Sequence, residues 1–196
     1  MKNKQAELIN QLSDKELLYN LVLTQIILLT ISFFLGIILF KDYSAFFDLF
    51  HLGDIRIITI GLPIGILVVL YDLFMMKVTP ARFHDDGGIN ERIFSSLSSP
   101  MIIVVTFLIA FCEEVLFRGV LQTHIGLVWT SIIFAVVHYR YLFNWYLFVN
   151  VMMLSFGLGW LYEETRNLWI VITAHFVIDM LLGLIIRKKN RKGCLT

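Results

Sequence analysis

Six long apolar segments limit what this chain can fold into more than any other feature of its sequence. They cover residues 17–40, 55–76, 100–123, 125–143, 145–161 and 168–186. A helix crosses the roughly 30 Å hydrocarbon core of a bilayer with about 20 residues, so each segment is long enough to span. The sequence therefore predicts an all-α fold, a polytopic membrane helical bundle of about six transmembrane helices.

The composition agrees with a chain dissolved in lipid. Of its 196 residues, 58% are hydrophobic and only 16% are charged, and the mean hydropathy is +0.79, values outside the usage of soluble domains. The net charge of +1, with basic residues scattered except at the C-terminus, gives no reason to expect a nucleic-acid partner. Two cysteines in unrelated contexts indicate neither a disulfide framework nor a zinc site.

The segments divide the chain into three parts. Residues 1–99 contain a polar tail, two transmembrane helices and a cytoplasmic linker, residues 100–186 contain four transmembrane helices, and residues 187–196 form a basic cytoplasmic tail. If the N-terminus is inside, 12 Lys and Arg residues fall on the inner side, whereas only Lys41, Arg56 and Arg166 fall outside. The positive-inside rule then predicts an integral protein of a bacterial plasma membrane with both termini cytoplasmic.

The third apolar segment carries two carboxylates and a guanidinium. A charged residue at the centre of a membrane helix costs about 2.5–3.5 kcal/mol, so such groups usually face a protein interior or a water cavity. Glu114 and Arg118 are four residues apart with the acid first, the favoured order for an ion pair on one helix face. Glu113 points roughly 100° away. It is free to meet another helix and is the better candidate for a general base.

Two later segments add imidazoles and a third carboxylate. His138 ends the apolar run of the fourth segment, and His175 and Asp179 lie one turn apart in the sixth. A carboxylate can take a proton from water while imidazoles orient that water and stabilise an oxyanion. At 1.5 Å per residue, Glu113, His175 and Asp179 come out at similar heights, and His138 about 10 Å deeper toward the cytoplasm.

These motifs resemble those of the CPBP family, which includes type II CAAX prenyl endopeptidases and bacterial immunity or bacteriocin-processing proteins. The family pattern is a Glu-Glu pair with Arg after three residues, then Phe with His four later, then His with Asn or Asp four later. Residues 100–186 contain these in order and inside apolar segments: Glu113-Glu114 with Arg118, Phe134 with His138, and His175 with Asp179.

The resemblance implies an intramembrane glutamate-type endopeptidase that acts on a membrane-associated peptide or protein, in CAAX-type processing, peptide maturation or self-immunity. It implies that Glu113 is the catalytic base, that His138 positions water, and that His175 with Asp179 stabilises the oxyanion. Glu114, Arg118 and Phe134 would support them. No cofactor is expected. Zinc bound by Glu113, His138 and His175 is a minority alternative, and the zincin motif His-Glu-x-x-His is absent.

Other interpretations remain open from the residues alone. The Glu114–Arg118 pair suits a purely structural role, and His138 suits an interfacial aromatic belt. The whole protein could be a non-catalytic membrane protein that binds and regulates a partner membrane protein, or a small transporter with a proton relay. Pro63 is expected to kink the second span, Gly157 and Gly159 to allow close helix approach, and Gln25 to bridge helices.

Overall fold

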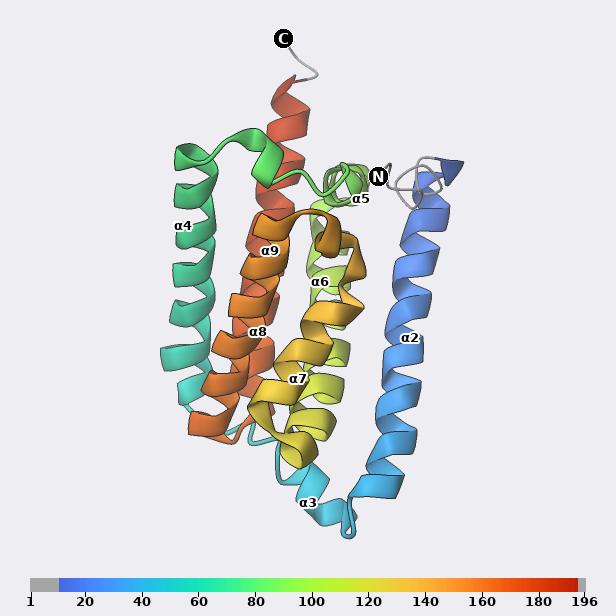
Figure 1. The fold of residues 1–196 in the computed structure, drawn as a ribbon, viewed down its shortest axis with the longest axis vertical. Helices are drawn as coiled ribbons and strands as arrows, with labels where there is room; N and C mark the ends of the chain where they lie inside the picture. The colour runs from blue at the N-terminus through green and yellow to red at the C-terminus, as the bar shows by residue number, and fades with distance from the viewer. Residues whose placement is uncertain (1–10, 194–196) are drawn as a thin grey trace.

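The computed structural model describes residues 11–193, which are helical over most of their length and contain no strand (Figure 1). The helices in chain order are α2 (Asp14–Leu39), α3 (Tyr43–Phe47), α4 (Leu62–Val78), α5 (Ile89–Ser96), α6 (Ser99–Glu114), α7 (Thr123–Val137), α8 (Trp145–Thr165) and α9 (Leu168–Gly193). Two π-helices, η1 (Ile57–Gly61) and η3 (Val115–Gln122), and two 3₁₀ turns, η2 (Ala81–Phe83) and η4 (Tyr139–Phe143), complete the order.

Five helical stretches are long and apolar enough to cross a membrane, which confirms the predicted polytopic helical bundle. They are Asp14–Leu39, Ile57–Val78, Ser99–Val137, Trp145–Thr165 and Leu168–Asn190. The 39-residue stretch Ser99–Val137 contains both the third and the fourth predicted segments. The difference from six arises because no loop separates these two segments, and the chain instead turns back within the stretch.

Gly126 makes that turn. Its φ of 79° and ψ of 171° are non-helical, and a positive φ is accessible to glycine without the steric penalty of a Cβ. Figure 1 shows the chain descending through α6 and returning obliquely through α7. Helix α7 has 15 residues, so at about 1.5 Å per residue it is shorter than a full crossing.

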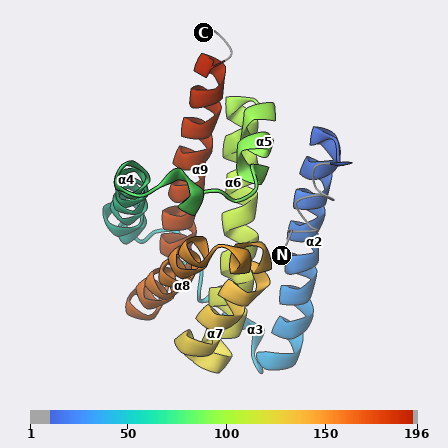
Figure 2. The ribbon, with the colours of Figure 1, turned by 45° about the horizontal axis from the view of Figure 1, so that its top comes forward.

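The helices form a bundle with α6 and α9 at its centre. Helices α6 and α9 pack on each other, α4 packs on α9, and α2 packs on α6 and η3. Figures 1 and 2 place α4 and α2 at opposite edges, with α7 and α8 together on a third side. The start of α2 and the end of α9 lie at the same end of the bundle (Figure 1).

The polar linker between the second and third segments folds onto that end. Its short helix α5 buries Ile89, Ile93 and Phe94 in a cluster that also contains Leu17 of α2 and Ile102 of α6. Helix α9 continues beyond the predicted apolar segment, so the first residues of the basic segment 187–196 extend it as far as Gly193. The linker and the end of α9 thus cap one end of the bundle.

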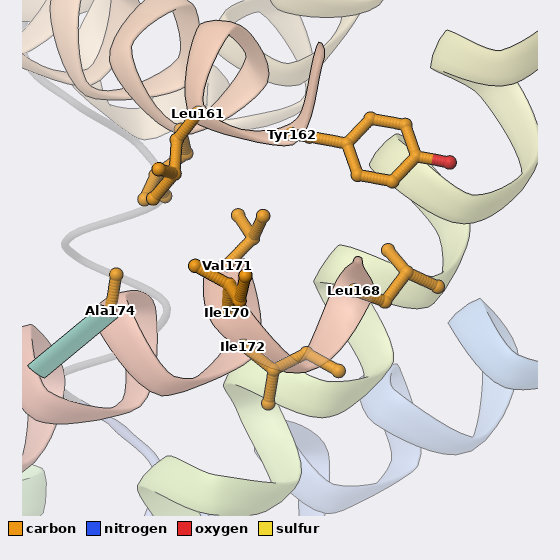
Figure 3. Packing of buried hydrophobic residues seen from close by; sticks show 8 residues of the cluster. Leu161, Tyr162, Leu168, Ile170, Val171, Ile172 and Ala174 are labelled. Carbon is orange, nitrogen blue, oxygen red and sulfur yellow. The ribbon is translucent and has the colours of Figure 1, made fainter. Parts of the chain in front are cut away.

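Apolar packing fixes α9 against α8. A core of eight buried residues joins the two helices, with Leu158, Leu161 and Tyr162 on α8 and with Leu168, Ile170, Val171, Ile172 and Ala174 on α9 (Figure 3). Each of these side chains is at most 6% exposed. The first two turns of the helix that carries His175 and Asp179 are therefore held in place by side chains of α8.

Two glycines bring the second span close to α9. A Cβ at Gly61 would lie 2.7 Å from the carbonyl oxygen of Ile170, and one at Gly65 would lie 2.7 Å from that of Ala174. Small residues spaced by four permit this approach of membrane helices. Pro63 lies at the start of α4, directly after the π-helix η1 and inside the continuous helical stretch Ile57–Val78. The helix geometry therefore changes next to the proline, and the kink stays a prediction.

The prediction for the two glycines of α8 is half right. A Cβ at Gly159 would lie 2.4 Å from Leu127 Cδ1 and 2.8 Å from Gln122 Oε1, so this glycine does permit a close approach. A Cβ at Gly157 would meet nothing within 4 Å, and the prediction for Gly157 is wrong. Only one of the two positions faces the neighbouring helices.

Candidate active site

The two adjacent glutamates lie where the helix geometry changes. Glu113 and Glu114 are the last residues of α6, and the π-helix η3 follows at once with Arg118 and Gly119 in it. Wider π turns are rare and occur often at functional sites, where they rotate side chains out of α-helical register. The sequence motif thus coincides with an irregularity inside the span.

Glu114 is fully buried and has a partner on each oxygen. Its Oε1 lies 2.7 Å from His175 Nδ1, and its Oε2 lies 3.2 Å from Arg118 Nε, with both side chains of the latter pair 0% exposed. The predicted pairing of Glu114 with Arg118 is confirmed. The contact is ionic rather than a directed hydrogen bond, because neither atom has a hydrogen-bond partner among the described residues.

Arg118 is held by groups from two other helices. Its Nη2 donates to the Ser155 carbonyl at 3.1 Å and to Ser155 Oγ at 3.2 Å. Its guanidinium carbon lies 4.8 Å from the centroid of the Phe134 ring, within the range of a cation–π contact. A buried cation needs such compensation, and α7 and α8 provide it.

Glu113 turns away from this pair, as predicted, and meets the end of α7. Its Oε2 lies 4.0 Å from His138 Nε2. His138 Nδ1 lies 2.7 Å from the Phe134 carbonyl, so Nδ1 carries the proton that it donates there, and Nε2 is the nitrogen that faces Glu113. The phenyl ring of Phe134 packs against the imidazole with 4.4 Å between centroids.

The expectation that His138 lies about 10 Å deeper than Glu113 is wrong, since the two side chains approach to 4.0 Å. A depth of about 10 Å would require a regular helix from residue 125 that runs parallel to the membrane normal. The chain is non-helical at Gly126, so the regular part of α7 starts later, and α7 runs obliquely to α6 (Figure 1). Both effects reduce the height that the chain gains along the membrane normal before it reaches His138. His138 directly follows the last helical residue, Val137.

His175 connects the buried pair to Asp179. Its Nδ1 lies beside Glu114, and its Nε2 lies 3.6 Å from Asp179 Oδ2. The sequence indicated the His175–Asp179 spacing on one face of α9, but it gave no sign that Glu114 would orient the imidazole. With Nδ1 donating to Glu114, the Nε2 edge of the ring is the one directed toward Asp179.

Burial separates the site into two groups. The inner cluster comprises Glu114, Arg118, Ser155 and His175, each at most 4% exposed. The open edge comprises Glu113, His138 and Asp179, whose side chains are 12%, 26% and 27% exposed. A carboxylate and an imidazole at the open edge can reach a water molecule and a substrate. The inner cluster can only position its neighbours, except for His175, whose Nε2 edge faces Asp179 at the open edge.

The predicted alternative of a zinc site finds no matching geometry. Within residues 11–193, no three His, Cys, Asp or Glu side chains are grouped so that they could hold a metal ion. Of the three residues named for zinc, Glu113 and His138 approach each other, but the Nδ1 of His175 is directed at Glu114 instead. The expectation that no cofactor is bound stays a prediction.

Sequence reasoning missed two residues that hold the site together. Ser155 is a small residue in an apolar helix, and nothing in its sequence context marks it as the partner of Arg118. Asn167, fully buried before α9, accepts from the Trp169 N–H at 3.0 Å and donates to the His51 carbonyl at 2.9 Å. An Asn immediately before an apolar helix is a capping signal, and that signal could have found it.

Comparison with known proteins agrees with the geometry. Residues 95–181, which include all the predicted site residues, match the family described as Type II CAAX prenyl endopeptidase Rce1-like. The chain is 48% identical over 165 residues to the uncharacterized protein YpbD of Bacillus subtilis (strain 168). The aligned residues cover 84% of this chain and 87% of that protein. No solved structure matches. This integral membrane protein belongs to the type II CAAX prenyl endopeptidase Rce1-like family.

Proposed function

We propose that the protein is a glutamate-type intramembrane endopeptidase that hydrolyses a peptide bond in a membrane-associated peptide or protein. The observation that carries the proposal is the pairing of Glu113 with His138 at the open edge, while the adjacent Glu114 is held by Arg118 and His175. Of the two adjacent glutamates, Glu114 thus has a structural role. Glu113 remains available to a water molecule.

The reaction follows from these positions. Glu113 takes a proton from water while the Nε2 of His138 helps to hold that water, and the water oxygen bonds to the carbonyl carbon of the substrate. The oxyanion that develops accepts a hydrogen bond from the Nε2–H of a protonated His175, whose positive charge Glu114 and Asp179 balance. The C–N bond then breaks, the proton held by Glu113 passes to the leaving amine, and a new carboxyl end and a new amine are released.

The substrate class follows from the environment of the site. Glu113, His138 and His175 lie within or at the ends of apolar spans, so the scissile bond must be brought to membrane depth. A prenylated C-terminal peptide, a hydrophobic peptide leader or a bacteriocin-like peptide can each satisfy that requirement. The relative in Bacillus subtilis supports a bacterial plasma membrane. The start of α2 and the end of α9 lie at the same end of the bundle, which agrees with termini on one side, and the excess of Lys and Arg assigns that side to the cytoplasm.

The test is cleavage by the purified protein in liposomes. The panel contains a farnesylated CAAX peptide, its unprenylated form and a hydrophobic leader peptide, with products identified by mass spectrometry. Wild type is compared with Glu113→Gln and His175→Ala, and with Glu164→Gln as a control at an exposed glutamate of α8. Every preparation is also assayed with a chelator and checked for monodispersity.

The proposal predicts that wild type and Glu164→Gln cleave at least one peptide, that Glu113→Gln and His175→Ala do not, and that the chelator has no effect. Inhibition by the chelator that zinc reverses would point instead to a metal held by Glu113, His138 and His175. A cellular phenotype that survives Glu113→Gln would contradict the proposal. It would favour a non-catalytic protein that binds a partner membrane protein.

A further inference from the structure

His138 lies at the open edge on a stretch of chain outside the regular helix. It follows the last residue of α7, and its φ of −80° and ψ of 42° are non-helical. Glu113 does not fix the imidazole, because 4.0 Å between Glu113 Oε2 and His138 Nε2 exceeds the length of a hydrogen bond. Other groups must therefore orient the ring if Nε2 is to stay directed at Glu113.

Phe134 supplies the first contacts to the ring. Its carbonyl oxygen lies 2.7 Å from His138 Nδ1, and its phenyl ring packs against the imidazole with an interplanar angle of 31°. Both contacts come from one residue in the preceding turn of α7. A ring held by one residue alone can still tilt away from Glu113, so a second support is needed to fix its plane.

Tyr141 of the turn η4 supplies that second support. Its ring lies parallel to the imidazole of His138, with an interplanar angle of 8° and 6.1 Å between centroids, within the range of offset aromatic stacking. Its backbone N–H also donates to the His138 carbonyl at 2.9 Å. Two parallel rings restrict each other's tilt, so the plane of the Tyr141 ring sets the plane of the imidazole.

The hydroxyl of Tyr141 is in turn tied to the polar linker between α4 and α6. Asn90 of the short helix α5 donates from Nδ2 to this hydroxyl in a long hydrogen bond of 3.4 Å. Helix α5 is itself fixed, because Ile89 and Ile93 on either side of Asn90 are buried in the apolar cluster shared with α2 and α6. A line of contacts thus runs from the buried core through Asn90 and Tyr141 to His138.

A second tie holds the end of the same turn. Asn144 follows η4, and its Nδ2 lies within hydrogen-bond distance of three carbonyl oxygens of the linker, those of Arg82 (3.3 Å), Phe83 (3.0 Å) and Asp85 (3.3 Å). Its Oδ1 accepts from the Tyr146 N–H at 3.2 Å and so caps α8. Figure 1 shows the linker passing above this turn. The linker therefore holds η4 at its end as well as at its centre.

We propose that Tyr141 is a positioning residue that keeps Nε2 of His138 directed at Glu113, and that the linker fixes Tyr141 through Asn90. The inference rests on the proposed hydrolytic function and gives the segment between the second and third spans a part in it. Asn90 lies outside the region 95–181 that matches the family. Misplacement by about 1 Å can lower a rate on the order of 10²-fold, so loss of the Tyr141 ring should lower kcat by roughly that factor.

The orientation of His138 can be measured without a substrate. The ring ¹⁵N signals of a histidine report which nitrogen carries the proton, and their loss in His138→Gln assigns them in protein labelled at histidine. In the structure Nδ1 donates to the Phe134 carbonyl, so wild type should show the Nδ1–H tautomer at alkaline pH. We expect a mixture of both tautomers in Tyr141→Leu, and a tautomer close to that of wild type in Tyr141→Phe, which keeps the ring.

The kinetic arm uses whichever peptide wild type cleaves. Tyr141→Leu should lose on the order of 10²-fold in kcat with KM unchanged, and Tyr141→Phe should lose less. The control is Phe143→Leu, which changes an aromatic residue of the same turn that is 58% exposed, and it should cleave at the wild-type rate. A Tyr141→Leu protein with the wild-type His138 signals and kcat overturns the inference. If only its melting temperature fell, Tyr141 would merely stabilise the turn.

A double-mutant cycle tests the tie to the linker. Asn90→Leu and Tyr141→Phe both remove the hydrogen bond between the two side chains, so each should lower kcat. The double variant should fall no further than the larger of the two single falls, because residues that act through one contact are not additive. A fall equal to the product of the two single falls would overturn the link between Asn90 and Tyr141.

The inference and the proposed function can fail separately. If wild type cleaves no peptide but Tyr141→Leu shows both tautomers, hydrolysis is contradicted, while the holding of His138 by Tyr141 is supported. If wild type cleaves and Tyr141→Leu changes neither the tautomer nor kcat, the protease stands and only the role of Tyr141 is overturned. If Tyr141→Leu does not fold, Asn90→Leu and Tyr141→Phe decide, and a wild-type kcat in both overturns the inference.

Discussion

The inner cluster and the open edge contain the same kinds of side chain in opposite conditions. Glu114 and Glu113 are neighbours in sequence, yet Glu114 is 0% exposed with a partner on each oxygen, whereas the side chain of Glu113 is 12% exposed and 4.0 Å from an imidazole. His175 is enclosed, and His138 ends a helix at the edge. The two adjacent glutamates thus belong to different groups, Glu114 to the inner cluster and Glu113 to the open edge.

The difference teaches how a membrane bundle can bury one carboxylate and leave its neighbour in sequence accessible. Buried charge in lipid requires a partner and directed hydrogen bonds, and the inner cluster satisfies this with groups from α6, η3, α8 and α9. Glu113 needs no such partner, because it borders the exposed edge. The contrast predicts that changes in the inner cluster reduce stability and that changes at the open edge reduce activity.

The largest effect on stability is expected from Arg118→Met. Met fills much of the space but leaves Glu114 buried without its cation, and loss of one partner of a buried pair costs about 3–5 kcal/mol. Thermal unfolding in detergent followed by circular dichroism measures it. Arg92→Met serves as a control, because Arg92 pairs with Asp14 at a partly exposed site, and such pairs contribute about 0–1 kcal/mol. Equal effects of the two changes would remove the distinction between the groups.

A smaller effect is expected from Gly159→Ala. The added Cβ would lie 2.4 Å from Leu127 and 2.8 Å from Gln122, and overpacking of this kind costs about 1–3 kcal/mol. It would push η3, which carries Arg118, away from α8. Gly157→Ala in the same helix meets nothing within 4 Å, and its melting temperature should equal or exceed that of wild type. A reversed order of the two variants would contradict the packing of α8.

Phe134→Leu should lower the stability by less than Gly159→Ala does. Phe134 connects the inner cluster to the open edge. The Phe134 ring contacts Arg118 of the inner cluster and His138 of the open edge. Leucine keeps most of the apolar contact but loses the cation–π contact, worth about 0.5–2 kcal/mol. Phe134→Tyr, which keeps an aromatic face, is the comparison in the same unfolding assay. If leucine were as stable as tyrosine, the ring face would have no role in holding Arg118.

The smallest effect on stability is expected from Glu113→Gln. Glu113 is partly exposed and forms no buried ion pair, so the free energy of unfolding should change by no more than about 0.5 kcal/mol. The measurement is the same unfolding assay, with Asp179→Asn as a second open-edge variant. A loss comparable to that of Arg118→Met would assign Glu113 to the inner cluster.

The sequence was sufficient for the membrane bundle and for most of the residues that the structure brings together at the candidate site. Long apolar runs are a strong signal because a bilayer requires them, and charges inside such runs stand out because they are costly. The spacing of Glu114 and Arg118 predicted their pairing, since both lie on one helix. Features that depend on a single helix are therefore within the reach of sequence reasoning.

Contacts between helices were not predictable in the same way. The bond from His175 to Glu114 depends on how α9 is rotated against α6, which is decided by the core with α8 and by the contacts of Gly61 and Gly65. The height of His138 depended on the turn at Gly126 and the tilt of α7.

The most direct test of the central claim compares Glu113→Gln with Glu114→Gln in one experiment that measures both the melting temperature and the cleavage rate. The account predicts that Glu113→Gln melts like wild type and loses at least about 10²-fold in kcat. It predicts that Glu114→Gln melts at a markedly lower temperature, because a buried guanidinium and imidazole lose their anion. A stable, active Glu113→Gln protein would contradict the account.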